Sequence, residues 1–258
     1  MQLTNAHFDI YELGGADVPR LGADDPRNIG VARALVFVVR EDPKDLREIF
    51  GVDGTIGGSV EATYGNYNAV TLKGDITGPI GEGVAFSLDG SYNRRDGYGE
   101  IVNLGKDISD RNRWSARGQL LIEPTADLKI RAIADYSKID EVCCVVSTLV
   151  AGPSAAAIVG VGGGLSTDFF SYDTYLNQEP INKVDNYGGS VQVDWDRGSI
   201  GITSITAYRE LKNFVDQDVD FTSADIVRER RDQRVKTFTQ VAFTVIPGCL
   251  SDGYKQEP

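Results

Sequence analysis

The sequence predicts an all-β protein, an antiparallel meander of about eight long strands. Three observations support this. From Gly58 onward, apolar and polar residues alternate over long segments, which is the period of a strand with two different faces. Turn residues separate these segments. The chain also has 29 glycines and 21 tyrosines and phenylalanines but one methionine, a composition typical of turn-rich β structure.

The first residues lack this alternation. They contain a short apolar run, 35–39, and the pair Asp42-Pro43, which favours a short helix reaching Ile49. We therefore expect three parts. Residues 1–56 form an N-terminal segment, 57–240 form the sheet, and 241–258 are an unrelated C-terminal tail.

The first hairpin spans 60–80 and shows two faces of opposite character. Its turn is expected at Gly65-Asn66-Tyr67-Asn68. In its second arm the apolar face carries Val70, Leu72 and Ile76, and the other face carries Thr71, Lys73 and Asp75.

The remaining strands follow in order, each recognised by the same alternation. A turn at 78–83 leads from the first hairpin into the third strand. The expected later strands are 84–93, 114–122, 128–136, 187–195, 200–214 and 235–240.

The connections alternate between short and long. Tight turns are expected near Pro79, Thr125 and Arg197, whereas long loops occupy 94–112, 140–186 and the polar stretch after Phe214. Transmembrane barrels have short turns on one side of the membrane and long loops on the other. The pattern therefore predicts a partial transmembrane β-barrel.

The side chains of the strands agree with this interpretation. Charged residues recur on one strand face, which suits a wet lumen, and aromatic residues gather near strand ends, which suits the membrane interface. The alternative is that tyrosine simply favours strands. The charged residues are Lys73, Asp75, Asp89, Arg117, Lys129, Arg131, Asp135 and Asp194. The candidate interface aromatics are Tyr64, Tyr67, Tyr92, Tyr98, Trp114, Tyr136, Tyr187 and Tyr208 beside the long loops, and Trp195 beside a short turn.

Several functional classes are disfavoured. The net charge of −12 argues against a nucleic-acid partner. A single histidine, His7, gives little basis for a catalytic triad or a zinc site. The glycine run 160–167 lacks the lysine of a P-loop. We therefore predict no enzyme activity, no catalytic, metal or cofactor-binding residues, and no cofactor.

The cysteines show no CxxC spacing; they are Cys143, Cys144 and Cys249. Cys143 and Cys144 open the longest loop, where they form either a functional vicinal disulfide or metal-sensitive tip, or a structural staple in an oxidising compartment; we favour the staple. Acidic loop residues offer a site for a cationic or metal-bearing ligand, although solvated charges are the preferred interpretation. They are Asp168, Asp173, Glu179, Asp216, Asp218 and Asp220.

No targeting or spanning segment is visible. The first residues have neither a basic region nor an apolar region of a signal peptide, and no apolar run is long enough for a transmembrane helix.

Three short motifs follow one another between residues 57 and 240. They are Tyr64-Gly65-Asn66-Tyr67-Asn68, then Asn93-Arg94-Arg95-Asp96-Gly97-Tyr98, and then the run RWSARG that starts at Arg113. In the order and spacing of these motifs, residues 57–240 resemble the first barrel strands of TonB-dependent outer-membrane receptors.

The resemblance implies active uptake of a scarce ligand, such as a ferric siderophore, across the outer membrane of a Gram-negative bacterium. In that family a plug closes a 22-stranded barrel, and the energy-coupling protein TonB acts on the complete receptor. The implied partners are outer-membrane lipid and an unidentified small ligand.

The chain departs from the family at both ends. Residues 1–56 show no recognisable plug, and about eight strands are expected. We therefore expect a fragment from the N-terminal part of the barrel domain, not competent for transport by itself. The alternative is a soluble β-sandwich or adhesion-type binding domain.

Overall fold

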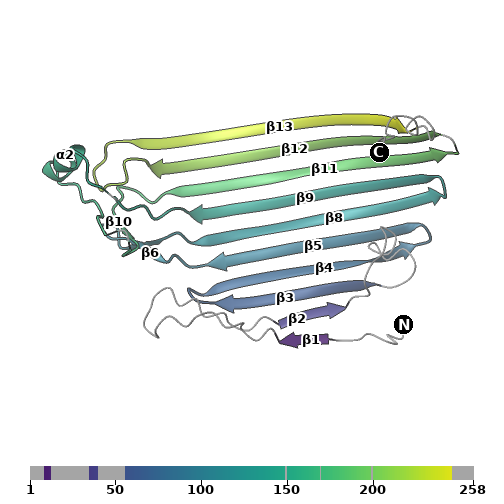
Figure 1. Ribbon diagram of the computed structural model, residues 1–258, viewed down its shortest axis with the longest axis horizontal. Coiled ribbons are helices and arrows are strands. Elements are labelled where there is room, and N and C mark those ends of the chain that lie inside the picture. The colour runs from purple at the N-terminus through teal and green to yellow at the C-terminus, as the bar shows by residue number, and fades with distance from the viewer. Residues whose placement is uncertain are drawn as a thin grey trace, which may run out of the picture.

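The computed structural model describes residues 9–12, 35–39, 56–148, 150–168, 170–198 and 200–245. Within these ranges one large antiparallel sheet has the strand order β1-β2-β3-β4-β5-β8-β9-β11-β12-β13 (Figure 1). The prediction of an all-β meander is confirmed, and eight of these strands lie between Gly57 and Val245. The bounds are β1 Asp9–Glu12, β2 Leu35–Val39, β3 Gly57–Gly65, β4 Ala69–Gly81, β5 Val84–Arg95, β8 Arg111–Thr125, β9 Leu128–Val142, β11 Ile181–Arg197, β12 Ile200–Asp218 and β13 Arg228–Val245.

The sheet is open in the part of the chain that the structure describes, with β1 and β13 as its outer strands. Neighbouring strands form a single broad layer (Figure 1). Few side chains in this layer are fully buried. Ala85 and Leu121 form one small buried pair near the turn between β4 and β5.

The two faces of the sheet differ in chemistry, as the alternation predicts. We call the first the apolar face; it exposes large side chains that an ordinary core would bury, such as Val60 (55% exposed) and Leu88 (51%). Its other exposed members include Leu72, Ile76, Tyr92, Trp114, Val191, Trp195 and Tyr208. The opposite, polar face carries Glu61, Lys73, Asp75, Asp89, Arg117, Asp135 and Arg209.

The strand connections differ at the two ends of the sheet. Two-residue turns join β4 to β5 at Glu82-Gly83 and β8 to β9 at Ala126-Asp127, and β11 ends at Arg197, close in sequence to the start of β12 at Ile200. At the other end, long connections fill 96–110, 143–180 and 219–227. The predicted alternation of short and long connections is confirmed. We call the second end the loop end.

The first hairpin turns where the sequence predicts, at 66–68. Tyr67 and Asn68 adopt φ values of 59° and 52°, and the Ala69 amide donates to the Asn66 carbonyl at 3.2 Å. Asparagine tolerates this left-handed conformation better than most residues, which fits its place in the turn.

Pro79 is the first local correction, because it lies inside β4 and not in a turn. β3 begins at Gly57, which pairs with Thr77, so within the described ranges Pro79 has a paired neighbour in β5 but none in β3. The register shifts between Pro79 and Gly81 at this point. A residue without an amide hydrogen is tolerated at such an irregular position.

The charged stretch before residue 235 is the second correction. It was expected to be a loop, but β13 begins at Arg228 and continues to Val245, past the predicted limit of 240. Cross-strand ion pairs explain the difference: Arg228 binds Asp216 and Arg234 binds Glu210, each with a shortest separation of 2.6 Å. The predicted helix at 42–49 and the tail residues 246–258 lie outside the described residues.

The long connections contain small elements that the alternation does not reveal. β6 (Gly99–Ile101), β7 (Lys106–Ile108) and β10 (Asp173–Thr174) form a separate three-stranded sheet in the order β10-β6-β7. One short helix, α2 (Ser154–Gly160), lies in the longest loop.

Candidate functional site

The loops at the loop end are joined into one unit by the small sheet. β10 pairs in parallel with β6, so the loop 143–180 is bound to the loop 96–110. Ile101, Ile108 and Leu176 are almost completely buried beneath this sheet, with Val142 and Val145 packed against them. The loops 96–110 and 143–180 therefore form one connected unit at this end of the large sheet.

The third loop joins the same unit through polar contacts. The Ser223 amide donates to the Gly164 carbonyl at 3.0 Å, and the Gly164 amide donates to Ser223 Oγ at 2.6 Å. Asp218, at the end of β12, accepts a hydrogen bond from the Asn177 amide at 3.1 Å. All three long connections are therefore tied together.

The acidic loop residues do not converge on a ligand site. Asp216 binds Arg228, Glu179 binds Lys106, and Asp218 and Asp220 accept hydrogen bonds from nearby backbone amides. Asp168 accepts from the Phe170 amide, and Asp173 pairs with Glu100 in the small sheet. Within the described ranges, no group of three or more His, Cys, Asp or Glu side chains is placed to hold a metal ion.

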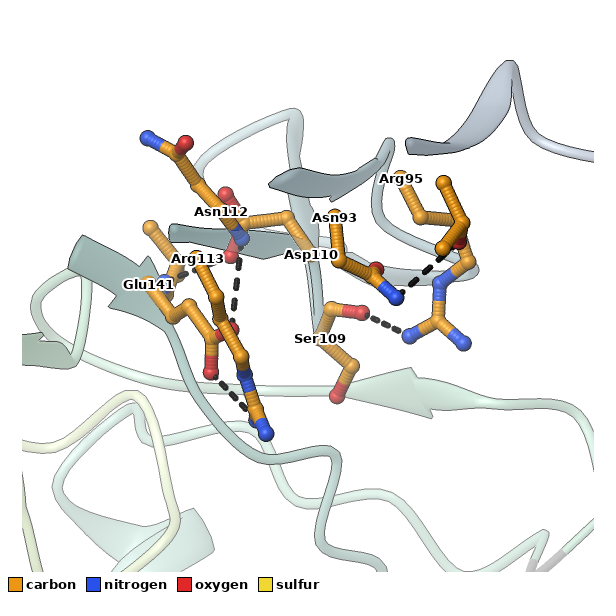
Figure 2. Close-up of polar contacts among 9 residues, drawn as sticks. Asn93, Arg95, Ser109, Asp110, Asn112, Arg113 and Glu141 are labelled. Atoms are coloured by element: carbon orange, nitrogen blue, oxygen red, sulfur yellow. Dashed lines mark hydrogen bonds and ion pairs between the residues drawn. The ribbon is translucent and has the colours of Figure 1, made fainter. Parts of the chain in front are cut away.

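An ion pair with a buried carboxylate lies at the loop end (Figure 2). Glu141, near the end of β9, is 6% exposed and accepts from Arg113 Nε and, at 2.8 Å, from Arg113 Nη2. The same carboxylate accepts from the Asn112 amide at 3.2 Å. Glu141 therefore joins the start of β8 to the end of β9.

Asp110 makes a second junction between the same strands. It accepts from the Val142 amide at 2.6 Å. Burial raises the pKa of the Asp110 carboxyl above its ordinary value, and the negative charges of Glu141 and Asp140 add to this effect.

A cavity of about 380 Å³ opens between the large sheet and the loops. Its lining combines three arginines, Arg94, Arg95 and Arg111, with the carboxylates of Asp96, Asp107, Asp110 and Glu179. The sequence did not mark Arg95, Arg111, Arg113 or Glu141 as site residues, and Arg95 and Arg113 entered only as members of motifs that carry the family resemblance. The available signal was a pair of basic clusters on either side of one loop, at 94–95 and 111–113.

A larger hollow of about 600 Å³ lies over the polar face. Its lining includes Lys73, Asp89, Arg117 and Asp135. Arg209 crosses it to bind both oxygens of Asp135, at 2.7 and 2.9 Å. The charged strand residues thus lie on one surface, where ion pairs form between Arg209 and Asp135, between Lys73 and Glu61, and between Lys129 and Glu123.

The predicted interface aromatics mostly form one band on the apolar face. Trp114 stacks on Tyr136 at a centroid distance of 4.8 Å, and Tyr136 stacks on Tyr187 at 6.2 Å. Tyr92 pairs directly with Trp114 across β5 and β8. We call the following set the aromatic band: Tyr64, Tyr92, Trp114, Tyr136, Tyr187 and Tyr208.

The aromatic band runs obliquely across the strands. The row of paired residues that contains Tyr208 reaches β3 at Gly58, whereas Tyr64 lies six residues further along that strand. β12 is the sixth strand after β3. Six residues rise about 20 Å along a strand, and six strand spacings cover about 29 Å across the sheet. The band is therefore inclined by about 35° to the rows of paired residues.

The three other predicted aromatics lie outside the band. Tyr67 is in the hairpin turn, and Tyr98 is in the loop 96–110, where its ring contacts Tyr67 at 6.4 Å and Tyr172 at 5.6 Å. Trp195 is on the apolar face near the opposite end of β11, with Arg197 over its ring.

The cysteines that open the longest loop are joined in a disulfide, Cys143–Cys144. Cys144 has a φ of 146°. The next residue, Val145, packs against the core of the small sheet, and its amide donates to Ser109 Oγ at 3.0 Å. His7 and Cys249 lie outside the described residues.

Comparison with known proteins gives no assignment: no model of a known protein family matches the chain, and no solved structure matches it. No helix among the described residues is both long and apolar enough to cross a membrane.

Proposed function

We propose that this chain is part of the β-barrel domain of a TonB-dependent receptor in the outer membrane of a Gram-negative bacterium. The complete receptor would take up a scarce ligand such as a ferric siderophore, and the chain alone would not transport it. In this proposal lipid contacts the apolar face, the ligand arrives at the loop end, and TonB acts only on the complete receptor. The chain has no enzymatic role and needs no cofactor.

The observation that carries the proposal is the inclination of the aromatic band. Strands of transmembrane barrels are tilted by about 35–45° from the membrane normal, and aromatic girdles mark the membrane interfaces. A girdle parallel to the membrane must therefore cross such strands obliquely. The angle of about 35° between the band and the rows of paired residues agrees with that tilt.

The spacing between the aromatics at the two ends agrees as well. Tyr187 and Trp195 lie on the same face of β11, eight residues apart. Eight residues rise about 26 Å along a strand, or about 22 Å along the membrane normal at a tilt of about 35°. The apolar band of an outer-membrane barrel is about 25 Å tall.

A soluble β-sandwich would bury the apolar face under a second sheet. The described residues supply one large layer, and Val60 and Leu88 on its apolar face remain half exposed. Lipid is the simpler partner for such a surface.

Tryptophan fluorescence tests the proposal, because the chain has two tryptophans, at opposite ends of the apolar face. The full chain is refolded with phosphatidylcholine vesicles brominated either near the headgroup or near the acyl-chain end. The single-tryptophan variants Trp114→Phe and Trp195→Phe report each end separately. We expect shallow bromines to quench both tryptophans more strongly than deep bromines.

Two results would contradict the proposal in different ways. Monodisperse protein in detergent-free buffer, with emission unaffected by brominated lipid, would favour the soluble sandwich. Stronger quenching by deep bromines would refute the girdle assignment of both tryptophans while leaving membrane insertion in place.

A further inference from the structure

Two arginines face each other on the last paired residues of β5 and β8. Arg95 is the direct cross-strand partner of Arg111. Like charges at directly opposed positions destabilise a sheet. Arg113, next on the same face of β8, is neutralised by the buried Glu141. The Arg95–Arg111 pair lacks such a counter-charge among the described residues.

The guanidinium groups retain donors that no described protein atom accepts. Arg95 donates Nη2 to the Ser109 carbonyl at 2.6 Å (Figure 2). Its guanidinium carbon also lies 4.8 Å from the centre of the Tyr98 ring. The Nε atoms of Arg95 and Arg111 are both shielded and have no acceptor in the described structure. Arg113 illustrates how the Nε and Nη2 side of a guanidinium binds an anion, because these two atoms donate to the two oxygens of the Glu141 carboxylate.

Both arginines line the cavity of about 380 Å³ at the loop end, a size within the range of ligand sites. Most carboxylates of the lining are engaged elsewhere. Glu179 binds Lys106, Asp96 accepts from Asn68, and Asp110 accepts from the Val142 amide. Asp107 is the remaining carboxylate of this lining.

We propose that Arg95 and Arg111 form a binding site for an oxyanion, the carboxylate or phosphate group of a small ligand that enters this cavity. Two guanidinium groups present planar arrays of donors that match such a group and would relieve their mutual repulsion. The proposal rests on the cavity and its charges, and it holds whether or not the chain belongs to a receptor.

The test uses the full chain, folded in detergent micelles, with ¹⁵N-labelled arginine. Citrate and inorganic phosphate are titrated separately, with chloride at matched ionic strength as the control, and the Nε–H resonances are followed. We expect saturable shifts of two resonances, which Arg95→Lys and Arg111→Lys assign by their disappearance. The oxyanion that saturates first identifies the preferred chemistry, carboxylate or phosphate.

Matched variants localise the site. Arg111→Gln should weaken binding by about tenfold or more, the value of one charge-assisted hydrogen bond. Arg197→Gln should leave binding unchanged, because Arg197 ends β11 at the opposite end of the sheet, where its guanidinium lies over the Trp195 ring. Asp107→Asn should tighten binding, because it removes a competing negative charge from the cavity lining.

Equal affinity of Arg111→Gln and the unaltered chain, or shifts that chloride reproduces, would overturn the proposal. So would the absence of a saturable shift at millimolar citrate and phosphate. If Arg95→Lys unfolds because the contacts of Arg95 with Ser109 and Tyr98 are lost, Arg111→Gln still decides the question.

Discussion

Replacing Arg113 by methionine should loosen the loop end more than any exposed ion pair nearby. The substitution keeps an aliphatic chain but leaves Glu141, 6% exposed, with the Asn112 amide as its remaining donor among those described. Two charge-assisted hydrogen bonds are lost, each with a net value of about 1.5–3 kcal/mol when well shielded. Arg113 is itself 48% exposed, so we discount the total to about 2 kcal/mol of local opening free energy.

Hydrogen exchange of the full chain in micelles measures this effect. About 2 kcal/mol corresponds to roughly 30-fold faster exchange of amides at 109–113 and 140–145 in Arg113→Met. Amides around the turn at Ala126-Asp127, at the other end of β8 and β9, should keep their rates.

The matched control is Lys183→Met. It removes an ion pair to Asp140 whose partners are 48% and 37% exposed, and it should cost less than about 1 kcal/mol. The double variant Arg113→Met/Glu141→Leu should cost less than the sum of the single variants, because no buried charge remains unpaired. Additive costs, or an equal cost for Lys183→Met, would refute the reasoning.

Three further predictions concern the same end of the molecule. Because the folded pKa of Asp110 is raised, its proton stabilises the fold at low pH, and this stability is lost as the pH rises through the folded pKa. Asp110→Asn should therefore raise the urea midpoint at about pH 7 but not at about pH 3; an equal rise at both would contradict the burial argument. Ile101→Ala, at a fully buried site, should cost about 2–5 kcal/mol and expose the loop 143–180 to proteolysis; unchanged digestion would contradict its core role. Gly99→Ala would place Cβ 2.6 Å from the Tyr172 carbonyl oxygen and should lower the free energy of unfolding, measured by urea titration, by about 1–3 kcal/mol. Gly81→Ala, whose Cβ meets no atom within 4 Å, is the control, and an equal loss of stability in both variants would exclude overpacking as the cause.

The large sheet was predictable because its signal is local. Alternation places Leu72 on one face and Lys73 on the other whatever the neighbouring strand is, and the structure keeps that assignment across eight strands. The turn at 66–68 was equally visible, since its residues tolerate left-handed backbone conformations.

The loop end was not predictable in the same way, because its structure depends on contacts between residues that lie far apart in the sequence. β10 and β6 have two and three residues, too few for a recognisable period, and they pair across more than seventy residues of sequence. The charged start of β13 has no apolar alternation, and it becomes a strand because its arginines Arg228 and Arg234 form ion pairs with Asp216 and Glu210 of β12. The opposition of Arg95 and Arg111 appears only once the register of β5 and β8 is known.

The joining of the three loops has a consequence for how this protein can be altered. Because the small sheet and its core join segment 96–110 to segment 143–180, and the Ser223–Gly164 bonds join 143–180 to 219–227, none of the three can be exchanged alone without breaking contacts with a neighbouring loop. A chimera that inherits all three from one parent keeps every contact, whereas a chimera that mixes parents does not. Sequence changes at this end are therefore expected to replace all three loops together. A substitution at a contact in one loop should be tolerated when the contacting residue of the neighbouring loop changes with it.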